Sequence, residues 1–426
     1  MISILPYGQV PNEAIFARTE PASKVEAVVS DILADVRQNG DAALYKYCRQ
    51  FDRADLTSLE VTAEELDAAA AQVEPELLEV LRRAAANIEA FHRRQLRTSF
   101  VISEQDGVVL GQKITPLSRV GLYIPGGTAS YPSSVLMNCI PAKLAGVPEV
   151  VMVTPASGGA LNPVILAAAR IAGVDRIFKV GGAQAVAALA YGTESVPRVD
   201  KIVGPGNAYV AEAKRQVFGQ VAIDMIAGPS EILIVADGSC NPRFVAADLL
   251  SQAEHDKLAS AVLVTDSPVL AHAVARELEA QLSQLPREEI ARASIEQNGK
   301  IIVAESLDQA VAIANEIAPE HLELSVDNPF DYLGKVRNAG SIFLGKYCPE
   351  ALGDYFAGPN HTLPTMGTAR FSSPLSVDDF IKKSSFTYYT ADALGKVAGD
   401  IAAFAEREGL HAHAKSATIR FEGESE

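Results

Sequence analysis

Residues 232–242 read Ile-Leu-Ile-Val-Ala-Asp-Gly-Ser-Cys-Asn-Pro, an aliphatic run that ends near Asp237 and leads into Asn241-Pro242. Asparagine directly before proline suits the N-cap and first position of a helix, because proline lacks the N–H that would be unsatisfied there. Nearly continuous apolar strands that alternate with helices are typical of a parallel sheet covered on both faces. This stretch therefore predicts one strand–helix unit of an α/β fold.

The same arrangement recurs on both sides of this stretch, from about Leu117 to Gly345. Further apolar runs bounded by Gly, Pro or Asp are Val150–Val153, Arg176–Val180, Ala261–Val264 and Ile301–Val303. The strand-to-helix joints resemble one another, since Asn162-Pro163 and Ser267-Pro268 repeat the pattern of Asn241-Pro242. The repeated joints indicate two copies of a βα-type unit. We expect an α/β fold with two Rossmann-like parallel-sheet domains.

The flanking segments have a different character. About residues 22–98 are expected to be helical, since apolar residues from Val25 to Val36 share one face at helical spacing. Downstream, residues 376–379 resemble a capping box with Asp in place of Glu, and a helix near 391–408 is stopped by Gly409. This tail has one apolar stripe and too little mass for a core, so it must pack against its own or a partner's body.

The expected organisation has four parts. They are an N-terminal arm (1–20), a discontinuous first Rossmann-like domain (21–119 with 234–373), a second Rossmann-like domain (120–233) and a C-terminal helical tail (374–426).

Composition narrows the class of protein. With 426 residues, 48% hydrophobic and 21% charged, the chain belongs among globular proteins rather than disordered ones. A net charge of −16 disfavours a nucleic-acid partner. The four cysteines lie far apart without a CxxC pair, which favours reduced thiols in a cytoplasm. Neither a signal peptide nor an apolar stretch of membrane-spanning length is visible, so we expect a cytoplasmic protein without a membrane partner.

Five of the seven histidines fall in short polar motifs that lie far apart in sequence. These motifs are Gln252-Ala253-Glu254-His255, Pro319-Glu320-His321, Gly353-Asp354-Tyr355 with His361, and Glu408-Gly409-Leu410-His411-Ala412-His413. Imidazole and carboxylate are the usual ligands of a zinc-type ion, and a catalytic site draws them from distant segments. Taken alone, each motif also fits an ordinary helix end, element boundary or surface turn.

Two of these motifs have a specific geometry or chemistry. Gln252 and His255, three apart at the end of a helical stretch, would share one helix face and could share an ion. In Glu320-His321, the imidazole could take a proton from an alcohol and the carboxylate could activate a water. His92 and His272 lie in amphipathic helical runs, where we expect surface residues without a function.

Three glycine-rich turns, at residues 124–128, 180–184 and 203–207, follow successive apolar runs. None is a G-x-G-x-x-G fingerprint. At the ends of parallel strands they would nevertheless present backbone N–H groups suited to a pyrophosphate. Ordinary strand-to-helix turns remain the alternative.

In combination, the motifs resemble the histidinol dehydrogenase family over essentially the whole chain. The ordered motifs that carry the resemblance are Tyr-Ile-Pro-Gly-Gly (123–127), Val-Gly-Gly-Ala-Gln-Ala (180–185), Val-Gly-Pro-Gly-Asn (203–207), Ala-Gly-Pro-Ser-Glu (227–231), Gln-Ala-Glu-His (252–255), Pro-Glu-His-Leu (319–322) and Gly-Asp-Tyr (353–355).

The resemblance implies zinc-dependent oxidation of L-histidinol to L-histidine by two hydride transfers to NAD. The implied metal ligands are Gln252, His255, Asp354 and His413, which would also contact substrate, and the implied acid–base pair is Glu320 and His321. Further implied substrate contacts are Ser230, His361 and Glu408, and implied cofactor contacts are Tyr123, Gln184 and Asn207. It also implies a homodimer in which the tail is swapped, so that Glu408 and His413 act in the partner's site. His411 remains a competing ligand.

Other functions remain open at this point. One is a paralogous zinc- and NAD-dependent dehydrogenase of another small polar alcohol. A second is a zinc hydrolase in which Glu320 activates water, although this leaves the glycine-rich turns unexplained. A non-catalytic binding protein is disfavoured by the density of ionisable residues.

Overall fold

A computed structural model describes residues 2–18, 25–126 and 131–423. The chain divides into two compact units. The first comprises Met1–Gln95 and Leu117–Phe380, and the second comprises Leu96–Pro116 and Ile381–Glu426. In the described ranges no helix combines the length and the apolar character needed to cross a membrane.

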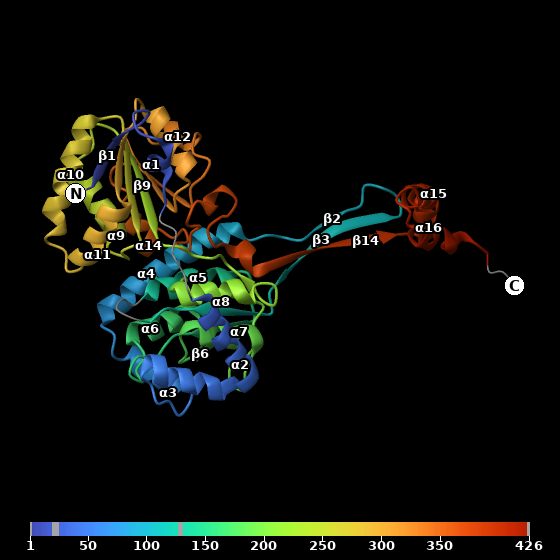
Figure 1. The fold of residues 1–426 in the computed structure, drawn as a ribbon. Coiled ribbons are helices and arrows are strands. Elements are labelled where there is room, and N and C mark those ends of the chain that lie inside the picture. The colour runs from blue at the N-terminus through green and yellow to red at the C-terminus, as the bar shows by residue number, and fades with distance from the viewer. Residues whose placement is uncertain (1, 19–24, 127–130, 424–426) are drawn as a thin grey trace. The chain divides into compact units, whose positions relative to one another are not determined.

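The first unit contains a six-stranded, fully parallel sheet (Figure 1). Its strands, in spatial order, are β1 (Ser3–Pro6), β11 (Lys300–Val303), β10 (Ser260–Thr265), β9 (Glu231–Ala236), β12 (His321–Ser325) and β13 (Ser341–Leu344). One face packs against α9 (Pro242–Ala253), α10 (Pro268–Leu282) and α11 (Glu288–Asn298). The other packs against α1 (Asn12–Phe16), α12 (Leu307–Ile317) and α13 (Phe330–Leu333).

A second parallel sheet in the same unit has five strands. In spatial order they are β6 (Arg176–Phe178), β5 (Glu149–Val153), β4 (Arg119–Tyr123), β7 (Lys201–Val203) and β8 (Ala222–Ile223). Helices α2 (Glu26–Tyr47), α7 (Gly182–Tyr191) and α8 (Ala208–Val217) pack on one face. The opposite face carries α3 (Ala63–Ala70), α4 (Pro75–His92), α5 (Pro132–Leu144) and α6 (Pro163–Ala172).

The prediction of two parallel sheets covered by helices is therefore confirmed. If the strands of each sheet are numbered in chain order and β1 is left out, both sheets have the order 3-2-1-4-5, which is that of a Rossmann fold. The predicted helix starts are also present. Asn162 and Asn241 accept hydrogen bonds from Val164 N and Arg243 N at 2.9 and 3.0 Å. Ser267 Oγ accepts one from Leu270 N at 3.2 Å.

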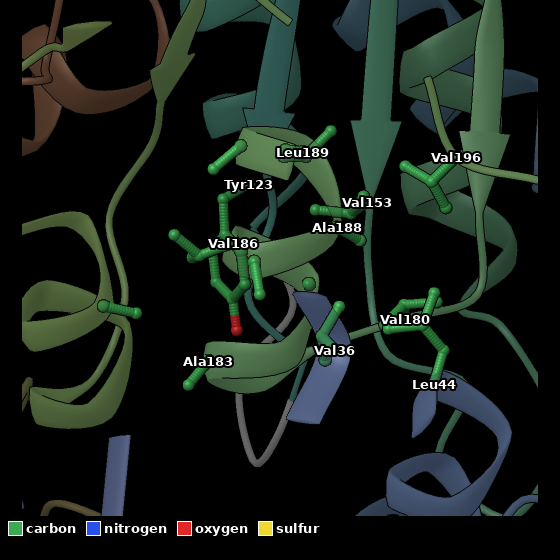
Figure 2. Close-up of a cluster of buried hydrophobic side chains, with 14 of the residues drawn as sticks. Val36, Leu44, Tyr123, Val153, Val180, Ala183, Val186, Ala188, Leu189 and Val196 are labelled. Atoms are coloured by element: carbon green, nitrogen blue, oxygen red, sulfur yellow. The ribbon is translucent and has the colours of Figure 1, made fainter. Parts of the chain in front are cut away.

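The N-terminal segments pack differently from the expected grouping, which joined residues 21–119 to 234–373. Side chains of α2 and α4, such as Val36 and Ile88, lie in the two cores of the five-stranded sheet. Figure 2 shows Val36 and Leu44 in the same core as Tyr123 and Val186. β1 is an edge strand paired with β11 rather than a free arm. An amphipathic stripe predicts a helix but not which sheet will bury it.

The second unit is a three-stranded antiparallel sheet with helices that follow it (Figure 1). The strands are β2 (Phe100–Ile102), β3 (Val108–Pro116) and β14 (Ile381–Tyr389), and the helices are α15 (Ala391–Arg407) and α16 (His411–Thr418). β14 corrects the expectation of a wholly helical tail. Its residues carry no apolar alternation, and the strand is specified by its nine-residue register with β3.

Short segments complete the described chain. They are η1 (Cys48–Asp52), η2 (Arg93–Gln95), α14 (Glu350–Tyr355), η3 (Thr368–Arg370), η4 (Val377–Phe380) and η5 (Ile419–Phe421). Asp379 Oδ2 accepts a hydrogen bond from Ser376 N at 2.8 Å, as expected for the predicted capping box. It opens only the single 3-10 turn η4 before β14 begins.

Candidate metal and catalytic site

The catalytic pair predicted from Pro319-Glu320-His321 lies at the start of β12, beside the start of β9. Glu320 Oε2 accepts a hydrogen bond from Glu231 N at 2.8 Å. His321 Nδ1 lies 3.0 Å from Glu231 O, and because a carbonyl can only accept, Nδ1 carries the proton. Both side chains are buried. The backbone of Glu231 thus holds the two groups and leaves His321 Nε2 as the nitrogen with a free lone pair.

The side chain of Glu231 is in turn paired with Arg18. Arg18 Nε lies 3.1 Å from Glu231 Oε1, and Arg18 Nη2 donates to Glu231 Oε2 at 3.3 Å. Ser230, the predicted substrate contact, immediately precedes β9, and its carbonyl accepts a hydrogen bond from Ser260 N at 3.0 Å. The catalytic pair therefore sits at the amino edge of its sheet, opposite the edge at which Rossmann-type sheets usually bind ligands.

The loop predicted at residues 353–361 begins as a helix. α14 places Glu350 and Asp354 one turn apart, on the same helix face. His361 follows in irregular chain, where its Nδ1 donates to Asp354 O at 3.1 Å. His361 Nε2 lies 3.2 Å from Ser134 Oγ at the start of α5.

These residues converge around His321. Its Nε2 lies 3.9 Å from Glu350 Oε1 and 3.8 Å from Asp354 Oδ1. One ligand atom from each of these three residues lies within 4.8 Å of the other two, an arrangement that could hold a metal ion. Glu350 was not identified from the sequence. Glu350 and Asp354 are four residues apart, a spacing that brings two side chains together only in a helix. Because the sequence predicted a loop here, this spacing did not point to Glu350.

Gln252 and His255 come from the end of α9. The sequence predicts a helical stretch from Phe244 to His255, but the helix ends at Ala253. A turn follows, in which His255 N lies 3.2 Å from Gln252 O. The neighbouring Ser251 Oγ donates to Glu350 Oε2 at 3.1 Å, which brings this helix end against α14. His255 also interacts electrostatically with Asp354 and His321.

Two unpartnered polar atoms here bear on metal binding. Gln252 Oε1 and His321 Nε2 are buried and have no hydrogen-bond partner among the described residues. Buried polar atoms normally have partners, and the amide oxygen of Gln252 is a suitable ligand for a divalent cation, whereas His321 Nε2 is left to meet a substrate proton. The residues present therefore fit a zinc-type ion.

The charge of the cluster also favours binding of a cation. Burial raises the pKa of Glu320 to about 7. Burial and the charge of Asp354 raise the pKa of Glu350 to about 8. Burial by itself disfavours a charged His321, but the carboxylates of Glu320, Asp354 and Glu350 outweigh it and raise the pKa to about 10. A cation among these carboxylates would offset their charge and lower this pKa, and His321 Nε2 would then be a free base at neutral pH. Several carboxylates crowded in a buried space are relieved by a cation.

The glycine-rich turns meet at the carboxyl edge of the five-stranded sheet. A Cβ on Gly126 would lie 2.4 Å from Pro155 Cγ, and one on Gly181 would lie 2.5 Å from Pro155 Cβ. A Cβ on Gly204 would lie 2.1 Å from Tyr123 O. The glycines after β4 and β6 therefore pack against the ring of Pro155 after β5, and the glycine after β7 packs against the backbone of Tyr123. Gly127 of the first motif lies outside the described residues.

The predicted cofactor residues lie on these turns. Tyr123 OH accepts a hydrogen bond from Gly182 N at 3.0 Å, and Gln184 is buried in the first turn of α7. Asn207 caps α8 by accepting from Tyr209 N at 3.1 Å. Since β4 and β7 are the strands between which the chain order reverses, Tyr123 and Asn207 lie where such folds bind dinucleotides.

A buried ion pair stabilises the glycine-rich turn at residues 203–207. Lys214 Nζ contacts Asp224 Oδ1, and both side chains are almost completely buried. Lys214 Nζ donates to Gly204 O at 3.0 Å, and Asp224 Oδ2 accepts from Gly204 N at 2.7 Å. Sequence reasoning identified neither residue, because both lie outside the glycine-rich motif.

The remaining histidines differ in burial and in the unit to which they belong. His272 is exposed as expected, but His92 is buried, which corrects its assignment to the surface. His92 Nδ1 lies 2.7 Å from Gln95 Oε1, and its Nε2 lies 3.5 Å from Asn360 Nδ2. Glu408, His411 and His413 belong to the second compact unit, where all three are exposed, and their roles stay predictions.

Comparisons with known proteins identify the family of this chain. The family model described as histidinol dehydrogenase matches residues 17–421. A histidinol dehydrogenase of Geobacter metallireducens is 59% identical over 417 residues, covering 97% of this chain and 96% of the relative. One from Listeria monocytogenes is 56% identical over 407 residues, covering 96% and 95%.

A solved structure agrees as well. The crystal structure of histidinol dehydrogenase from Elizabethkingia anophelis superposes with a TM-score of 0.94 at 40% identity, covering 98% of both chains. On the family match and on relatives that align over nearly their whole length, the chain belongs to the histidinol dehydrogenase family.

Proposed function

We propose that this chain oxidises L-histidinol to L-histidine through histidinal, with two successive hydride transfers to NAD at a zinc-containing site. Family membership supports an oxidoreductase of histidine biosynthesis. The observation that carries the mechanism is the joint anchoring of Glu320 and His321 by one residue, Glu231.

We assign Gln252, His255, Asp354 and His413 as the metal ligands. The unpartnered amide oxygen of Gln252 and the charge interaction between His255 and Asp354 support this set. When bound, the ion would orient the imidazole and amine of the substrate and offset the charge of the surrounding carboxylates. Because Gln252 is neutral, the site would carry less negative charge than an all-carboxylate one, which favours release of a nitrogen ligand.

In the first half-reaction, His321 Nε2 takes the hydroxyl proton as hydride leaves the same carbon for NAD, which yields histidinal and NADH. The bond from Nδ1–H to Glu231 O keeps Nε2 available as the base. In the second, Glu320 takes a proton from the water that adds to the aldehyde. The hydrate then transfers a hydride to a second NAD, which yields the carboxylate.

The remaining contacts follow the same assignment. Ser230 and His361 would bind the substrate, together with Glu408. Tyr123, Gln184 and Asn207 would line the NAD site, where the N–H groups at the start of α7 suit a pyrophosphate.

We further propose a homodimer in which the tail of one subunit supplies Glu408 and His413 to the other. Among the described residues of the second unit, the buried apolar ones are Val108 and five alanines, which is too little for a core. Its large exposed apolar residues include Phe100, Val101, Ile102, Leu110, Phe386, Tyr388, Tyr389, Ile401, Phe404, Leu410, Ile419 and Phe421. Such a surface requires cover by another body.

The function is tested by NADH formation from L-histidinol. We expect about two NADH per substrate consumed, loss of activity with a chelator and recovery with zinc. A paralogous alcohol dehydrogenase would reduce NAD with another alcohol but not with histidinol. A zinc hydrolase would form no NADH. Either result would overturn the proposal.

A further inference from the structure

Asp52 has an unpartnered buried oxygen that the proposed mechanism does not use. In the described part of the chain, four buried side-chain atoms lack a hydrogen-bond partner, on Gln252, His321, Glu323 and Asp52. The first two belong to the catalytic cluster, and Glu323 adjoins it by accepting a hydrogen bond from Glu350 N at 2.8 Å. Only Asp52 Oδ2 lies elsewhere. A buried acceptor without a donor is costly and calls for an explanation.

The backbone around Asp52 has two uncommon conformations, a π-helical turn and a left-handed residue, and together they set the position of Asp52. After α2 the chain continues as the π-helical segment Cys48–Asp52 and then turns through Arg53 at φ +54. Single π-helical turns and left-handed non-glycine residues both cost free energy and occur often at functional sites. Here they carry Asp52 to the sheet, where its carbonyl accepts a hydrogen bond from Gly158 N at 2.9 Å.

Gly158 lies in the loop that follows β5, so Asp52 stands at the carboxyl edge of the second strand of the sheet. In Rossmann folds, an Asp or Glu about 20 residues beyond the glycine-rich turn accepts hydrogen bonds from the ribose of NAD. Residues 150–174, which contain most of β5 and the loop after it, hold no Asp or Glu. The carboxylate of β5 itself, Glu149, lies at the amino end of the strand, where it pairs with Arg119 at 2.5 Å. Asp52 supplies from a distant segment the carboxylate that the carboxyl end of this strand lacks.

Tyr123 interacts electrostatically with this carboxylate. Its ring lies along Val186 with the hydroxyl toward the start of α7 (Figure 2). That hydroxyl already accepts a hydrogen bond from Gly182 N, so its own proton remains available to a ligand. Burial, with a smaller contribution from the charge of Asp52, raises the pKa of Tyr123 to about 12. Burial raises the pKa of Asp52 to about 6, so it is mostly ionised at neutral pH.

The two faces of the sheet indicate which half of a dinucleotide reaches Asp52. Cys48 and α2 pack on the face that carries α7. His361 of the catalytic cluster contacts Ser134 of α5, which packs on the opposite face. Since the nicotinamide must reach the catalytic cluster, the ribose at Asp52 belongs to the other nucleotide.

We propose that Asp52 accepts hydrogen bonds from the ribose hydroxyls of the adenosine half of NAD and so selects NAD over NADP. The inference rests on the proposed cofactor site. A 2′-phosphate would remove one hydroxyl donor and place a second negative charge against a half-buried carboxylate.

The test compares Asp52→Asn with Asp55→Asn, a matched control whose side chain is 87% exposed and pairs with Arg49 at 3.6 Å. We expect Asp52→Asn to raise the KM for NAD by about tenfold or more, since hydrogen bonds to charged groups are the stronger ones. The preference for NAD over NADP should fall by a similar factor. The kcat, the KM for histidinol and the zinc content should change little. Asp55→Asn should behave as the unmodified chain.

A stability measurement separates cofactor binding from a structural role. Because Asp52→Asn removes an unpaired buried charge, the Tm without cofactor should stay equal or rise. A lowered Tm with uniform loss of kcat, or an unchanged KM for NAD and unchanged preference, would overturn the inference. If Asp52→Asn does not fold, Asp52→Ser tests the same predictions through NADH binding measured by fluorescence.

Two further variants keep this inference distinct from the proposed function. Gln184→Ala and Asn207→Ala should each weaken NAD binding if the cofactor lies on these turns. If they do so and Asp52→Asn does not, only the role of Asp52 fails. If neither Gln184→Ala nor Asn207→Ala weakens NAD binding, the assigned cofactor site is wrong, and the role of Asp52 that depends on it is wrong as well.

Discussion

His321 Nε2 lies 3.9 Å from Glu350 Oε1, within a cluster that also contains Asp354. Glu350 is 2% exposed, and its Oε2 accepts a hydrogen bond from Ser251, the residue next to Gln252. It therefore links the proposed base to the helix end that carries two proposed ligands.

We expect Glu350→Gln to weaken zinc retention by about tenfold, as is typical when a group that supports metal ligands is replaced. The variant keeps the shape of the side chain but cannot ionise. A bound cation would lower the raised pKa of Glu350 and so gain a negative charge beside it, which Gln cannot supply. Competition with a chelator measures the affinity. Glu305→Gln, at an exposed position, is the control, and equal affinity of the two variants would contradict the role of Glu350.

The division of labour between Glu320 and His321 predicts unequal half-reactions. Glu320→Gln should retain oxidation of histidinol better than oxidation of histidinal, because only the second step needs a water activated at this position. Loss of a general base typically costs about 10²–10⁴ in rate. Initial NADH formation from each substrate gives the comparison. The same loss from both substrates would rule out separate roles.

Exchange of the tail predicts complementation between inactive chains. A His413→Ala chain and a Glu320→Ala chain should each be inactive, but a heterodimer should regain one intact site. Activity should return after subunit exchange, to at most about half that of the unmodified dimer at full heterodimer occupancy. Mass spectrometry of the mixture verifies exchange. Exchange without activity would count against a role for His413 in the partner's site.

The buried Lys214–Asp224 pair predicts a large loss of stability when one partner is removed. Lys214→Met should lower the free energy of unfolding by about 3–5 kcal/mol, because the carboxylate of Asp224 is left buried without a counter-charge. The double variant Lys214→Met/Asp224→Asn should recover part of this loss. Denaturant unfolding measures each value, and a double variant less stable than the single one would argue against the pairing.

Buried His92 predicts a pH dependence of stability. Burial lowers the pKa of His92, so the unfolded chain binds the proton more readily. Its contribution to stability is complete above the unfolded pKa of about 6.5 and falls as the pH drops toward the lower folded value. The stability of the unmodified chain relative to His92→Gln should therefore decline from pH 7 to 5. A pH-independent difference between the two proteins would contradict this role of His92.

Local features of the fold could be predicted from the sequence. Apolar runs gave the parallel strands, and Asn or Ser before Pro gave the helix starts, because both depend on neighbouring residues. The strand β14 and the sheet chosen by α2 and α4 could not be predicted, since each depends on a partner distant in sequence.

The sequence by itself determined the alternating α/β fold, the glycine-rich turns and the residue types suited to a metal and to acid–base chemistry. Tertiary structure alone decided that Glu231 holds both Glu320 and His321, that Glu350 joins the cluster, and that Asp52 reaches the edge of β5. The hydrogen bond from Glu231 N to Glu320 spans 89 residues. Periodicity encodes which face of an element is buried, whereas such contacts are fixed only when separate elements pack together.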